Sequence, residues 1–368
     1  MKLGLALVGA GEVIRSRHLP ALAALDHFQV RSVYDPDQRA AEAVATSTGA
    51  RVAATLDQAA RAQDVEAVTV ASPNAFHRAG VEAAAAAGKH VLCEKPIATT
   101  LRDARAMIEA AERAGVVLQL GFHHRFTSEF RLARRLLESG VIGGVRAFQA
   151  VISEPMSLVP KGNYRLREEV SGGLTLIDFG SHRLDQLRAL LGEAEEVSAL
   201  LSCAGPGHHL DDNVTLAIRT RAGALGALGV HRFSRGAFTP TVLLGDQGML
   251  CFGSYVVNPF QAAPVAVFSE APLPVEFLDL RRAADWWNPP SAGWTALWPP
   301  VVNPYVAEYE AFLRAIRGGA PPEPSGRDGY QTLEIVIAAY KSFLEGRVVR
   351  LPLDPEEDVP IPVFRESE

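Results

Sequence analysis

Two short polar motifs carry residues that could move protons. The first, Glu94-Lys95-Pro96, directly follows the apolar run at residues 90–93. The second runs from Asp178 to Asp185 and reads DFGSHRLD, within a segment otherwise rich in Leu and Ile. Positions i, i+4 and i+7 of a helix share one face, so we predict that Asp178, His182 and Asp185 form one polar stripe. A carboxylate one turn from an imidazole can orient it and raise its basicity, as a general base requires.

Each motif also has a simpler structural explanation. A lysine after a strand is most often a solvated charge, and a histidine on an apolar helix is most often a buried residue with satisfied hydrogen bonds. Pro96 fixes the turn after the strand and therefore the direction of Lys95. Gly180 would cost on the order of 1 kcal/mol inside a helix, so it predicts a close contact at that position. Both residues favour the functional interpretation.

The N-terminal segment is typical of a nucleotide site. An apolar strand at residues 3–8 ends in Gly9-Ala10-Gly11, and a helix-compatible segment follows, beginning with Glu12 and Val13. Gly9 permits a tight turn, Gly11 lets the backbone approach a pyrophosphate, and the helix N-terminus attracts its negative charge.

Two further residues qualify this fingerprint. Ile14 stands where a third small residue is expected, which would hold the helix farther from the strand. Asp35 closes the next apolar strand, at the spacing where an acid binds the adenosine ribose. Asp35 and Asp37 together favour NAD, because the 2′-phosphate of NADP would face two carboxylates. Arg39 is the nearby cation that could accommodate NADP.

Apolar strands alternate with helix-favourable segments as far as residue 120, which predicts parallel βαβ units. Ligands of such sheets bind beyond the carboxyl ends of the strands. Gly9, Asp35, Pro73, Lys95 and His123 all fall at predicted strand ends. We therefore predict an α/β fold in which residues 1–122 form a Rossmann dinucleotide-binding domain.

The pattern changes after Gly121 to short strands separated by tight turns. Residues 123–368 are predicted to form an α+β domain for substrate binding and oligomerisation, with a mostly antiparallel open sheet. Two helices at residues 304–317 and 328–344 close the chain and can pack back on the first domain. All four tryptophans lie at residues 285–304, which we interpret as a long ordered loop serving as a pocket lid or an interface.

Composition excludes several functional classes. The 368 residues are 48% hydrophobic and 21% charged, as in ordinary globular proteins. A net charge of −6 offers no basic surface for nucleic acid, and no apolar run nears the length of a membrane span. The three cysteines follow no metal-binding spacing, nor do His208-His209 and Asp211-Asp212, so we expect no metal. Three cysteines cannot all pair, which predicts a reducing compartment, the cytoplasm.

With these residues in view, the chain resembles the Gfo/Idh/MocA family of NAD(P)-dependent oxidoreductases, which includes glucose–fructose oxidoreductase and inositol dehydrogenase. The resemblance runs essentially from end to end. Its motifs are GAG at 9–11, ASPN with a following histidine at 71–77, CEKP at 93–96, GFHHRF at 121–126, GGLTLIDFGSHRLDQL at 172–187 and TLEIVIAAYKS at 332–342. The EKP and DxGxHxxD motifs at this separation are specific, whereas the glycine turn alone is not.

The resemblance implies roles for individual residues. Lys95 matches the catalytic lysine, His182 matches the histidine that exchanges the hydroxyl proton, and Asp178 matches its partner acid. Lys95-Pro96 would be a strained turn that can contain a cis peptide. Cofactor contacts are implied for Gly9, Gly11, Glu12, Val13, Asp35, Ser72, Pro73, Asn74, His77, Glu94, Lys95 and Arg125. Substrate contacts are implied for Lys95, His123, Asp178 and His182. Tyr164 precedes the segment that carries Asp178 and could also reach substrate, although a solvated loop is an equal alternative there. His123 departs from the family, which often has Asn or another polar residue there.

The implied reaction is hydride transfer between NAD and a secondary hydroxyl of a sugar, cyclitol or related polyol. His182 would take the hydroxyl proton while held by Asp178, and Lys95 would stabilise the developing negative charge on the same oxygen. Two other functions would use this fold: an NAD-using glycosidase working by oxidation, elimination and reduction, and a non-catalytic nucleotide or sugar sensor. The open sheet face predicts a homodimer or homotetramer.

Overall fold

The computed structural model describes residues 2–155, 163–205, 207–233, 236–253, 263–281 and 292–364. Its N-terminal half is built on a sheet of six parallel strands in the order β3-β2-β1-β4-β5-β6, which confirms the predicted Rossmann arrangement. The strands are β1 (Leu3–Val8), β2 (Phe28–Tyr34), β3 (Arg51–Val52), β4 (Ala67–Val70), β5 (His90–Glu94) and β6 (Leu118–Gly121). Residues in β1 and β4 are buried along their whole length, as expected for central strands covered on both faces.

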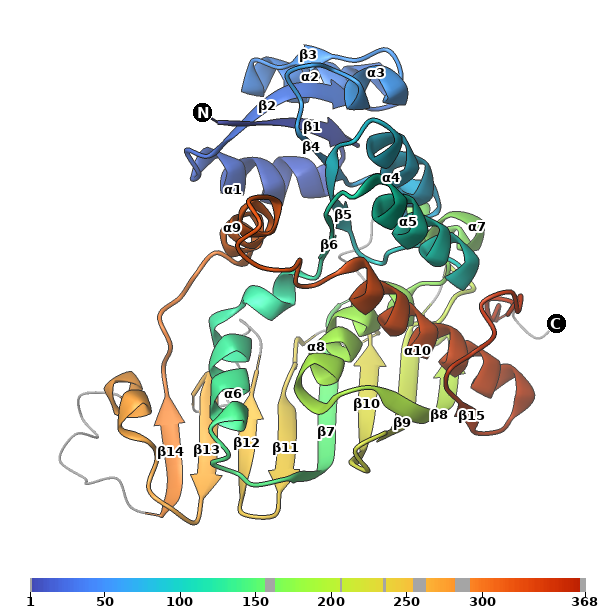
Figure 1. Ribbon diagram of the computed structural model, residues 1–368. Coiled ribbons are helices and arrows are strands. Elements are labelled where there is room, and N and C mark those ends of the chain that lie inside the picture. The colour runs from blue at the N-terminus through green and yellow to red at the C-terminus, as the bar shows by residue number, and fades with distance from the viewer. Residues whose placement is uncertain are drawn as a thin grey trace.

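Helices lie on both faces of this sheet (Figure 1). They are α1 (Leu19–Ala23), α2 (Gln38–Thr48), α3 (Leu56–Ala60), α4 (His77–Ala86) and α5 (Leu101–Ala114). Helix α5 shows how local sequence fixes their bounds. Thr100 caps its N-terminus by accepting a hydrogen bond from the N–H of Asp103, and Gly115 ends it in the left-handed conformation.

The C-terminal half contains a mixed sheet in the order β14-β13-β12-β11-β7-β10-β9-β8-β15. Among the strand pairs that the structure describes, only β10–β7 is parallel, so the prediction of a mostly antiparallel sheet is confirmed. The strands are β7 (Val145–Ser153), β8 (Ala194–Ser202), β9 (Asn213–Thr220), β10 (Leu225–His231), β11 (Thr241–Gly245), β12 (Gly248–Phe252), β13 (Val265–Ser269), β14 (Gly293–Leu297) and β15 (Val349–Arg350). The helices of this half are α6 (Ser128–Glu138), α7 (Glu168–Ser171), α8 (Ser181–Leu191), α9 (Pro304–Ile316) and α10 (Gly326–Glu345).

The predicted loop at 285–304 is wrong in part. Residues 293–297 form β14, which pairs with β13 in an antiparallel ladder. Trp294 lies on this strand, 60% exposed, and its ring meets that of Phe268 edge-on. Trp286 and Trp287 lie outside the described residues. The many proline and tryptophan residues in this segment favoured the interpretation as a loop. The strand was therefore not predicted, because its pairing partner is distant in sequence.

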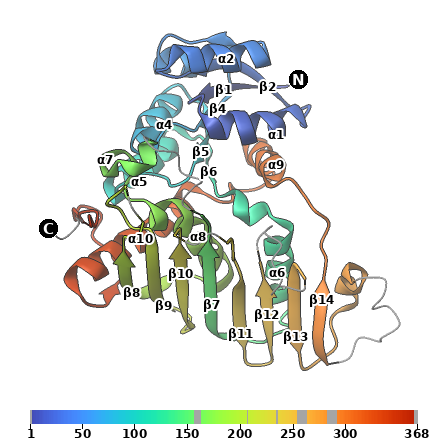
Figure 2. The same ribbon diagram turned by 180° about the vertical axis from the view of Figure 1, so that it is seen from behind.

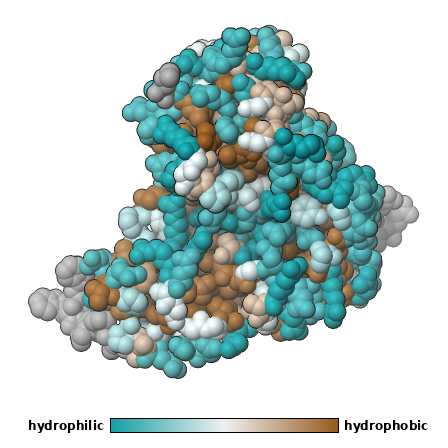
Figure 3. All heavy atoms as spheres, in the orientation of Figure 1, coloured by the Kyte–Doolittle hydropathy of each residue, from teal (hydrophilic) through white to brown (hydrophobic). Residues whose placement is uncertain are grey.

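Helices cover one face of the second sheet and leave the other bare. Helices α6, α8 and α10 lie in front of the strands in Figure 1, and Figure 2 shows the opposite face without a helix of the described chain. On the helix side, the mainly hydrophilic surface has apolar side chains gathered between α6 and α8 (Figure 3). Within the described part of the chain, no helix has the length and apolarity needed to cross a membrane.

The last helices pack against the first sheet. The N–H of Leu120 in β6 donates to the carbonyl of Pro324, just before α10 begins. One cluster of buried apolar side chains continues from β4, β5 and α5 through α10 into the second sheet. The predicted domain boundary between residues 122 and 123 falls directly after β6 and stays a prediction.

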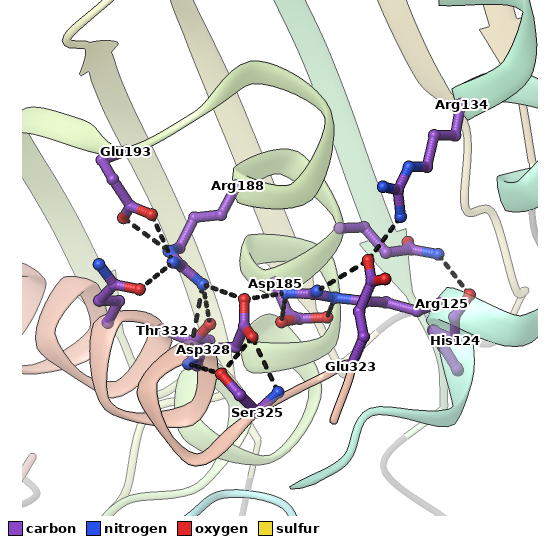
Figure 4. Close-up of polar contacts among 12 residues, drawn as sticks. His124, Arg125, Arg134, Asp185, Arg188, Glu193, Glu323, Ser325, Asp328 and Thr332 are labelled. Carbon is purple, nitrogen blue, oxygen red and sulfur yellow. Dashed lines mark hydrogen bonds and ion pairs between the residues drawn. The ribbon is translucent and has the colours of Figure 1, made fainter. Parts of the chain in front are cut away.

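A buried network of ions joins the two halves at this junction (Figure 4). Arg125, just after β6, forms a two-pronged contact with Asp185 of α8 at 2.7 and 2.6 Å, and reaches Asp328 of α10 at 2.8 Å. Asp328 also accepts hydrogen bonds from the N–H and hydroxyl of Ser325, which cap α10. Arg188 of α8 donates to the carbonyl oxygen of Asp328. The network therefore fixes α8, which carries His182, relative to the first sheet.

We expect Arg125→Met to lower the free energy of unfolding by about 3–5 kcal/mol, because it leaves the fully buried Asp185 carboxylate without its main partner. Urea denaturation measures the change. Arg113→Met is the matched control, since Arg113 makes only an exposed pair with Glu109 and should cost less than about 1 kcal/mol. Equal losses in the two variants would contradict a structural role for the network.

Candidate active site

The ends of β1 and β2 form the predicted nucleotide site. Gly9 has a φ of +98°, and a Cβ there would lie 2.6 Å from the carbonyl oxygen of Ala71, so only glycine fits this turn. A Cβ on Gly11 would meet no atom within 4 Å, which leaves room for a ligand beside the backbone. The Asp35 carboxylate accepts hydrogen bonds from the N–H groups of Ala10 at 2.7 Å and Asp37 at 2.8 Å. A tight turn, open space and a fixed acid suit a dinucleotide.

The helix after this turn contains a π-helical segment, Ile14–His18 (η1). Glu12 is exposed and Val13 half-buried ahead of it, at the predicted position for diphosphate contact. Ile14, the residue that departs from the fingerprint, is fully buried. The wider turns of η1 thus accommodate a large side chain where a small one was expected.

The loop after β4 is anchored by two of the predicted cofactor residues. The His77 ring lies between the carbonyl oxygens of Ser72 and Pro96, 2.8 Å from each. Burial lowers the pKa of His77, and the two carbonyl oxygens oppose this shift. Asn74 donates to the carbonyl of Ser171 at 2.8 Å, which ties this loop, including Pro73, to α7. Cofactor contacts for these residues stay predictions.

Glu94, at the end of β5, is held by a histidine that sequence reasoning missed. Nε2 of His18, the last residue of η1, lies 3.0 Å from the Glu94 carboxylate, and its Nδ1 lies 3.0 Å from the hydroxyl of Tyr309 in α9. Burial alone would raise the pKa of Glu94, but the contact with His18 and the charge of Lys95 lower it to about 2. Thr69 completes the chain of hydrogen bonds through Tyr309.

Lys95 points across to the second half of the molecule. The Lys95–Pro96 peptide is cis, as the resemblance implied. Lys95 Nζ lies 2.7 Å from Oδ1 of Asp178 and 3.0 Å from its carbonyl oxygen. Arg165 and Arg232 each approach Oδ2 of Asp178 at 3.2 Å. Burial would raise the pKa of Asp178, but these three cations hold it well below its usual range.

The contact between Asp178 and His182 that the predicted polar stripe implied is not found among the described residues. Asp178 lies in a second π-helical segment, Leu176–Gly180 (η6), which precedes α8 and changes the periodicity that the prediction assumed. Asp178 faces Lys95, whereas Asp185 faces Arg125. No hydrogen bond among the described residues joins Asp178 to His182, and Nδ1 of His182 has no partner there. Gly180 does mark a close approach, because a Cβ would lie 2.8 Å from the Leu176 side chain.

His182 instead belongs to a cluster with His123 and His124. The His124 and His182 rings are stacked with centroids 4.1 Å apart, and His123 stands edge-on to His182 at 4.9 Å. Burial lowers the pKa of all three, and the ammonium of Lys95 lowers them further, so Lys95 and His182 share one electrostatic environment. The rings of His124 and His182 are nearly parallel, so their in-plane lone pairs do not converge on one ion.

Two other predicted residues have defined surroundings. Tyr164 is half-buried in a short 3₁₀ turn, Tyr164–Leu166 (η5), and burial raises its pKa to about 12. The charge of Asp178 adds to this rise, which places Tyr164 near the Lys95–Asp178 pair. Arg125 is directed to Asp185 and Asp328, so its guanidinium serves the buried ion network.

Sequence reasoning also missed Arg232 and Tyr305. Arg232 directly follows β10, whose carboxyl end lies beside β7, and this strand end is the one signal that could have indicated it. Tyr305 stacks on His123 with centroids 4.4 Å apart and comes from α9, far along the chain. Contacts between such distant segments follow from tertiary packing, which local patterns do not report.

Known proteins resemble this chain over nearly its whole length. Residues 3–122 match the model of an oxidoreductase family with an NAD-binding Rossmann fold, residues 130–251 match the GFO/IDH/MocA C-terminal domain, and residues 295–351 match an oxidoreductase-family C-terminal alpha/beta domain. A 1,5-anhydro-D-fructose reductase of Ensifer adhaerens is 30% identical, over 94% of this chain and 97% of the relative. An inositol 2-dehydrogenase of Rhizobium meliloti (strain 1021) is 29% identical, over 95% and 100%.

Solved structures also resemble this chain over nearly its whole length. A levoglucosan dehydrogenase in complex with NADH has a TM-score of 0.82 and 25% identity, covering 96% of this chain and all of that one. The WlbA dehydrogenase of Bordetella pertussis, in complex with NADH and UDP-GlcNAcA, has a TM-score of 0.81 and 26% identity, with the same coverage.

We expect acid to destabilise the protein through its buried histidines. The pKa values of His123, His124 and His182 are lowered in the folded state, so below the unfolded value of about 6.5 the unfolded chain binds more protons. Stability is therefore retained above pH 7 and lost as the pH falls through 6.5, by about 1.4 kcal/mol per pH unit for each such histidine.

Urea unfolding at pH 7.5, 6.5 and 5.5 measures this slope. His124→Asn should reduce it, whereas His27→Asn, at an exposed position, should leave it unchanged. A wild-type free energy of unfolding that is constant over this range would show that the cluster is not neutral.

Proposed function

Because this chain belongs to the Gfo/Idh/MocA family of oxidoreductases, we propose that it transfers a hydride between a secondary hydroxyl of a sugar, cyclitol or related polyol and the nicotinamide of NAD. One observation carries the proposal. Lys95, from the cofactor end of the first sheet, reaches Asp178 at 2.7 Å, beside the helix that carries His182. The reductase and dehydrogenase names of the relatives support a sugar or cyclitol substrate.

Residues of the first sheet would hold the cofactor, which supplies the hydride acceptor when bound. Gly9 and Gly11 would border the diphosphate, and Asp35 would receive the adenosine ribose hydroxyls. Asp37 caps α2 close to Asp35, so a 2′-phosphate would meet two carboxylates. This charge favours NAD over NADP, although Arg39 offers one cation nearby.

His182 is suited to accept the proton of the substrate hydroxyl. Its lowered pKa leaves the ring neutral at pH 7, and its buried Nδ1 has no hydrogen-bond partner in the described chain. Lys95 would donate to the same oxygen and stabilise the negative charge that develops there. Buried Nδ1 of His123, also without a described partner, would contact another substrate hydroxyl, and Tyr164 would lie on the same side.

Asp178 acts on Lys95 in this proposal, and not on His182 as the sequence suggested. Its carboxylate stays ionised because Lys95, Arg165 and Arg232 surround it. It would therefore hold the Lys95 ammonium in place while substrate binds. The family role of a partner acid is retained, but its partner is the lysine.

A panel of sugars and cyclitols, assayed with NAD and NADP side by side, tests the activity by NADH formation at about 340 nm. We expect turnover with NAD on at least one polyol. Release of free sugar from an aryl glycoside without net NADH would point to the glycosidase instead, and binding of NAD and sugar without either reaction would point to a sensor.

We expect Lys95→Met and His182→Asn each to lower kcat by about 10²- to 10⁴-fold, because each removes a group that acts on the reacting oxygen. NAD affinity, followed by calorimetry, should stay within a few-fold of wild type. Lys89→Met is the matched control, since Lys89 bonds the carbonyl of Val65 away from the site. A wild-type rate in Lys95→Met would refute the site.

We also infer a homodimer or homotetramer formed through the bare face of the second sheet. Leu200 is 74% exposed and Trp294 is 60% exposed on this face, and large apolar side chains on an uncovered sheet are typical of an interface. Leu200→Glu combined with Trp294→Glu should lower the mass found by sedimentation to that of one chain. Val301→Glu, at a fully exposed position before α9, should leave the mass unchanged. A wild-type monomer would refute the inference.

We infer the cytoplasm as the location. All three cysteines are thiols in the structure, as expected in a reducing compartment.

A further inference from the structure

The connection between β8 and β9 brings three metal-ligating side chains together outside the active site. Cys203 directly follows β8, Asp212 directly precedes β9, and His208 lies in the loop between them. The two strands pair as antiparallel neighbours up to Ser202 and Asn213, so the two ends of the loop lie side by side. Sγ of Cys203, one ring nitrogen of His208 and one carboxylate oxygen of Asp212 lie within 4.8 Å of one another.

The spacing of these residues along the chain predicted no metal, because it matches no common zinc-binding motif. Such motifs place pairs of ligands a few residues apart within one turn. Here the pairing of β8 with β9 joins the first and the last residue of the connection, and a local sequence pattern does not report this pairing.

One nitrogen of the His208 ring is buried without a hydrogen bond. Nε2 lies 3.5 Å from Oδ2 of Asp212, but it has no hydrogen-bond partner among the described residues, and the side chain is only 4% exposed. A buried polar atom without a partner is costly, and an ion bound to it removes that cost. Two ligands of a tetrahedral zinc ion, each about 2.0–2.2 Å from it, lie about 3.3–3.6 Å apart. Nε2 and Oδ2 therefore already have the separation of two zinc ligands.

The carboxylate of Asp212 is held in one orientation. Its side chain is fully buried, and its two oxygens accept hydrogen bonds from the N–H groups of Ala204 at 2.7 Å and Gly205 at 2.6 Å. Each carboxylate oxygen has a further lone pair, so these bonds orient the group and leave Oδ2 able to bind an ion. Outer hydrogen bonds of this kind position metal-ligating carboxylates.

Gly205 keeps side-chain atoms away from both of these ligand atoms. It is not among the glycines with a positive φ, so its backbone does not require glycine. A Cβ there would lie 2.9 Å from Oδ2 of Asp212 and 3.2 Å from Nε2 of His208. An alanine side chain would therefore take up the space that an ion bound to these two atoms needs.

We propose that Cys203, His208 and Asp212 form a zinc site with three protein ligands, which ties the two ends of the β8–β9 loop together. Thiolate and imidazole ligands favour zinc over Mg²⁺ and Ca²⁺, which take oxygen ligands. A thiolate, a carboxylate and a neutral imidazole balance the two positive charges of zinc, so the ion is held with no net charge. Water completes the tetrahedron.

The thiol of Cys203 is the ligand whose bonding changes most. Its Sγ lies 3.5 Å from Nδ1 of His208, and 3.5 and 3.7 Å from the carbonyl oxygens of His208 and Gly205. These are weak contacts, because sulfur is a poor hydrogen-bonding atom. Zinc binding exchanges them for a bond of about 2.3 Å to the thiolate, and the S–H proton passes to solvent.

Neighbouring side chains of the same types have other partners and provide controls. His209 faces the carboxylate of Glu168 at 2.8 Å. Asp211 is directed to the start of the helix that carries the active-site carboxylate, where it accepts hydrogen bonds from the N–H groups of Leu174 and Leu176. Neither side chain is directed at the zinc ligands.

The zinc site borders the active site without belonging to it. The N–H of Arg232 donates to the carbonyl oxygen of Asp212, and the Arg232 side chain contacts Asp178. The ion thus steadies a loop that lies next to the surroundings of Asp178. The proposal stands whether or not the chain is a polyol dehydrogenase.

Metal content and cobalt substitution of the full chain test the proposal. After dialysis against micromolar Zn²⁺ and then against metal-free buffer, we expect about one zinc ion per chain by elemental mass spectrometry. Co²⁺ in place of zinc should give the visible absorption of a tetrahedral ion and a near-ultraviolet sulfur-to-cobalt band, which reports a thiolate ligand. Mg²⁺ and Ca²⁺ should not compete.

Cys203→Ser and His208→Gln should each weaken zinc binding by more than about 100-fold, measured by competition with a chromophoric chelator. Loss of a direct ligand exceeds the effect of losing an outer partner, which is about 10- to 100-fold. Cys203→Ser should also abolish the sulfur-to-cobalt band. Gly205→Ala keeps all three ligands and should still weaken binding. Cys251→Ser and His209→Gln are the matched controls and should bind zinc as the wild type does.

A wild-type chain that retains no zinc would overturn the proposal, as would unchanged zinc binding in Cys203→Ser. Zinc that is lost in His124→Asn and kept in Cys203→Ser would place the ion at the histidine cluster of the active site, which also overturns it. If a variant fails to fold, the cobalt spectrum of the wild type decides, because a tetrahedral spectrum without the sulfur band excludes Cys203 as a ligand.

Discussion

The active site depends on one buried anion, the carboxylate of Asp178. Three cations from three separate segments converge on it: Lys95 after β5, Arg165 in the turn before α7, and Arg232 after β10. A buried charge of this kind is tolerated only when its partners are held in place, so the two halves of the molecule must meet in one fixed arrangement. The apolar core that continues through α10 and the Arg125–Asp185 network provide that arrangement. The arrangement of the three cations around Asp178 therefore depends on how the two halves of the molecule pack together.

Much of the fold and part of the site follow from sequence patterns. The alternation of apolar strands and helices predicted the parallel sheet, and strand ends located Gly9, Asp35 and Lys95 correctly at its carboxyl edge. These features are predictable because each depends on residues that are close in sequence. β14 was missed because its identity as a strand comes from pairing with β13 across more than twenty residues, and not from a clear alternation of its own.

The relation between Asp178 and His182 could not be predicted for a different reason. An ideal helix places residues four apart on one face, and the prediction assumed that geometry. The structure inserts η6, whose wider turns direct Asp178 to Lys95 and leave His182 to stack on His124. The neighbours of His182 come from the turn after β6, so its environment is set by tertiary contacts. Its lowered pKa is thus a property of burial and of nearby cations rather than of an adjacent acid.

Each half of the described chain contains one π-helical segment, and both segments contact the end of β5. The η1 segment ends at His18, which meets Glu94 at the end of β5, and η6 carries Asp178, which meets Lys95 one residue further along. A π-helical turn adds a residue and rotates the following side chains, and such turns are frequent at functional sites. Here each one carries a polar side chain that contacts the same strand end. Because Glu94 and Lys95 are adjacent, one residue from each half of the molecule contacts the Glu94-Lys95 pair. The buried polar contacts at this strand end therefore depend on how the two halves pack together.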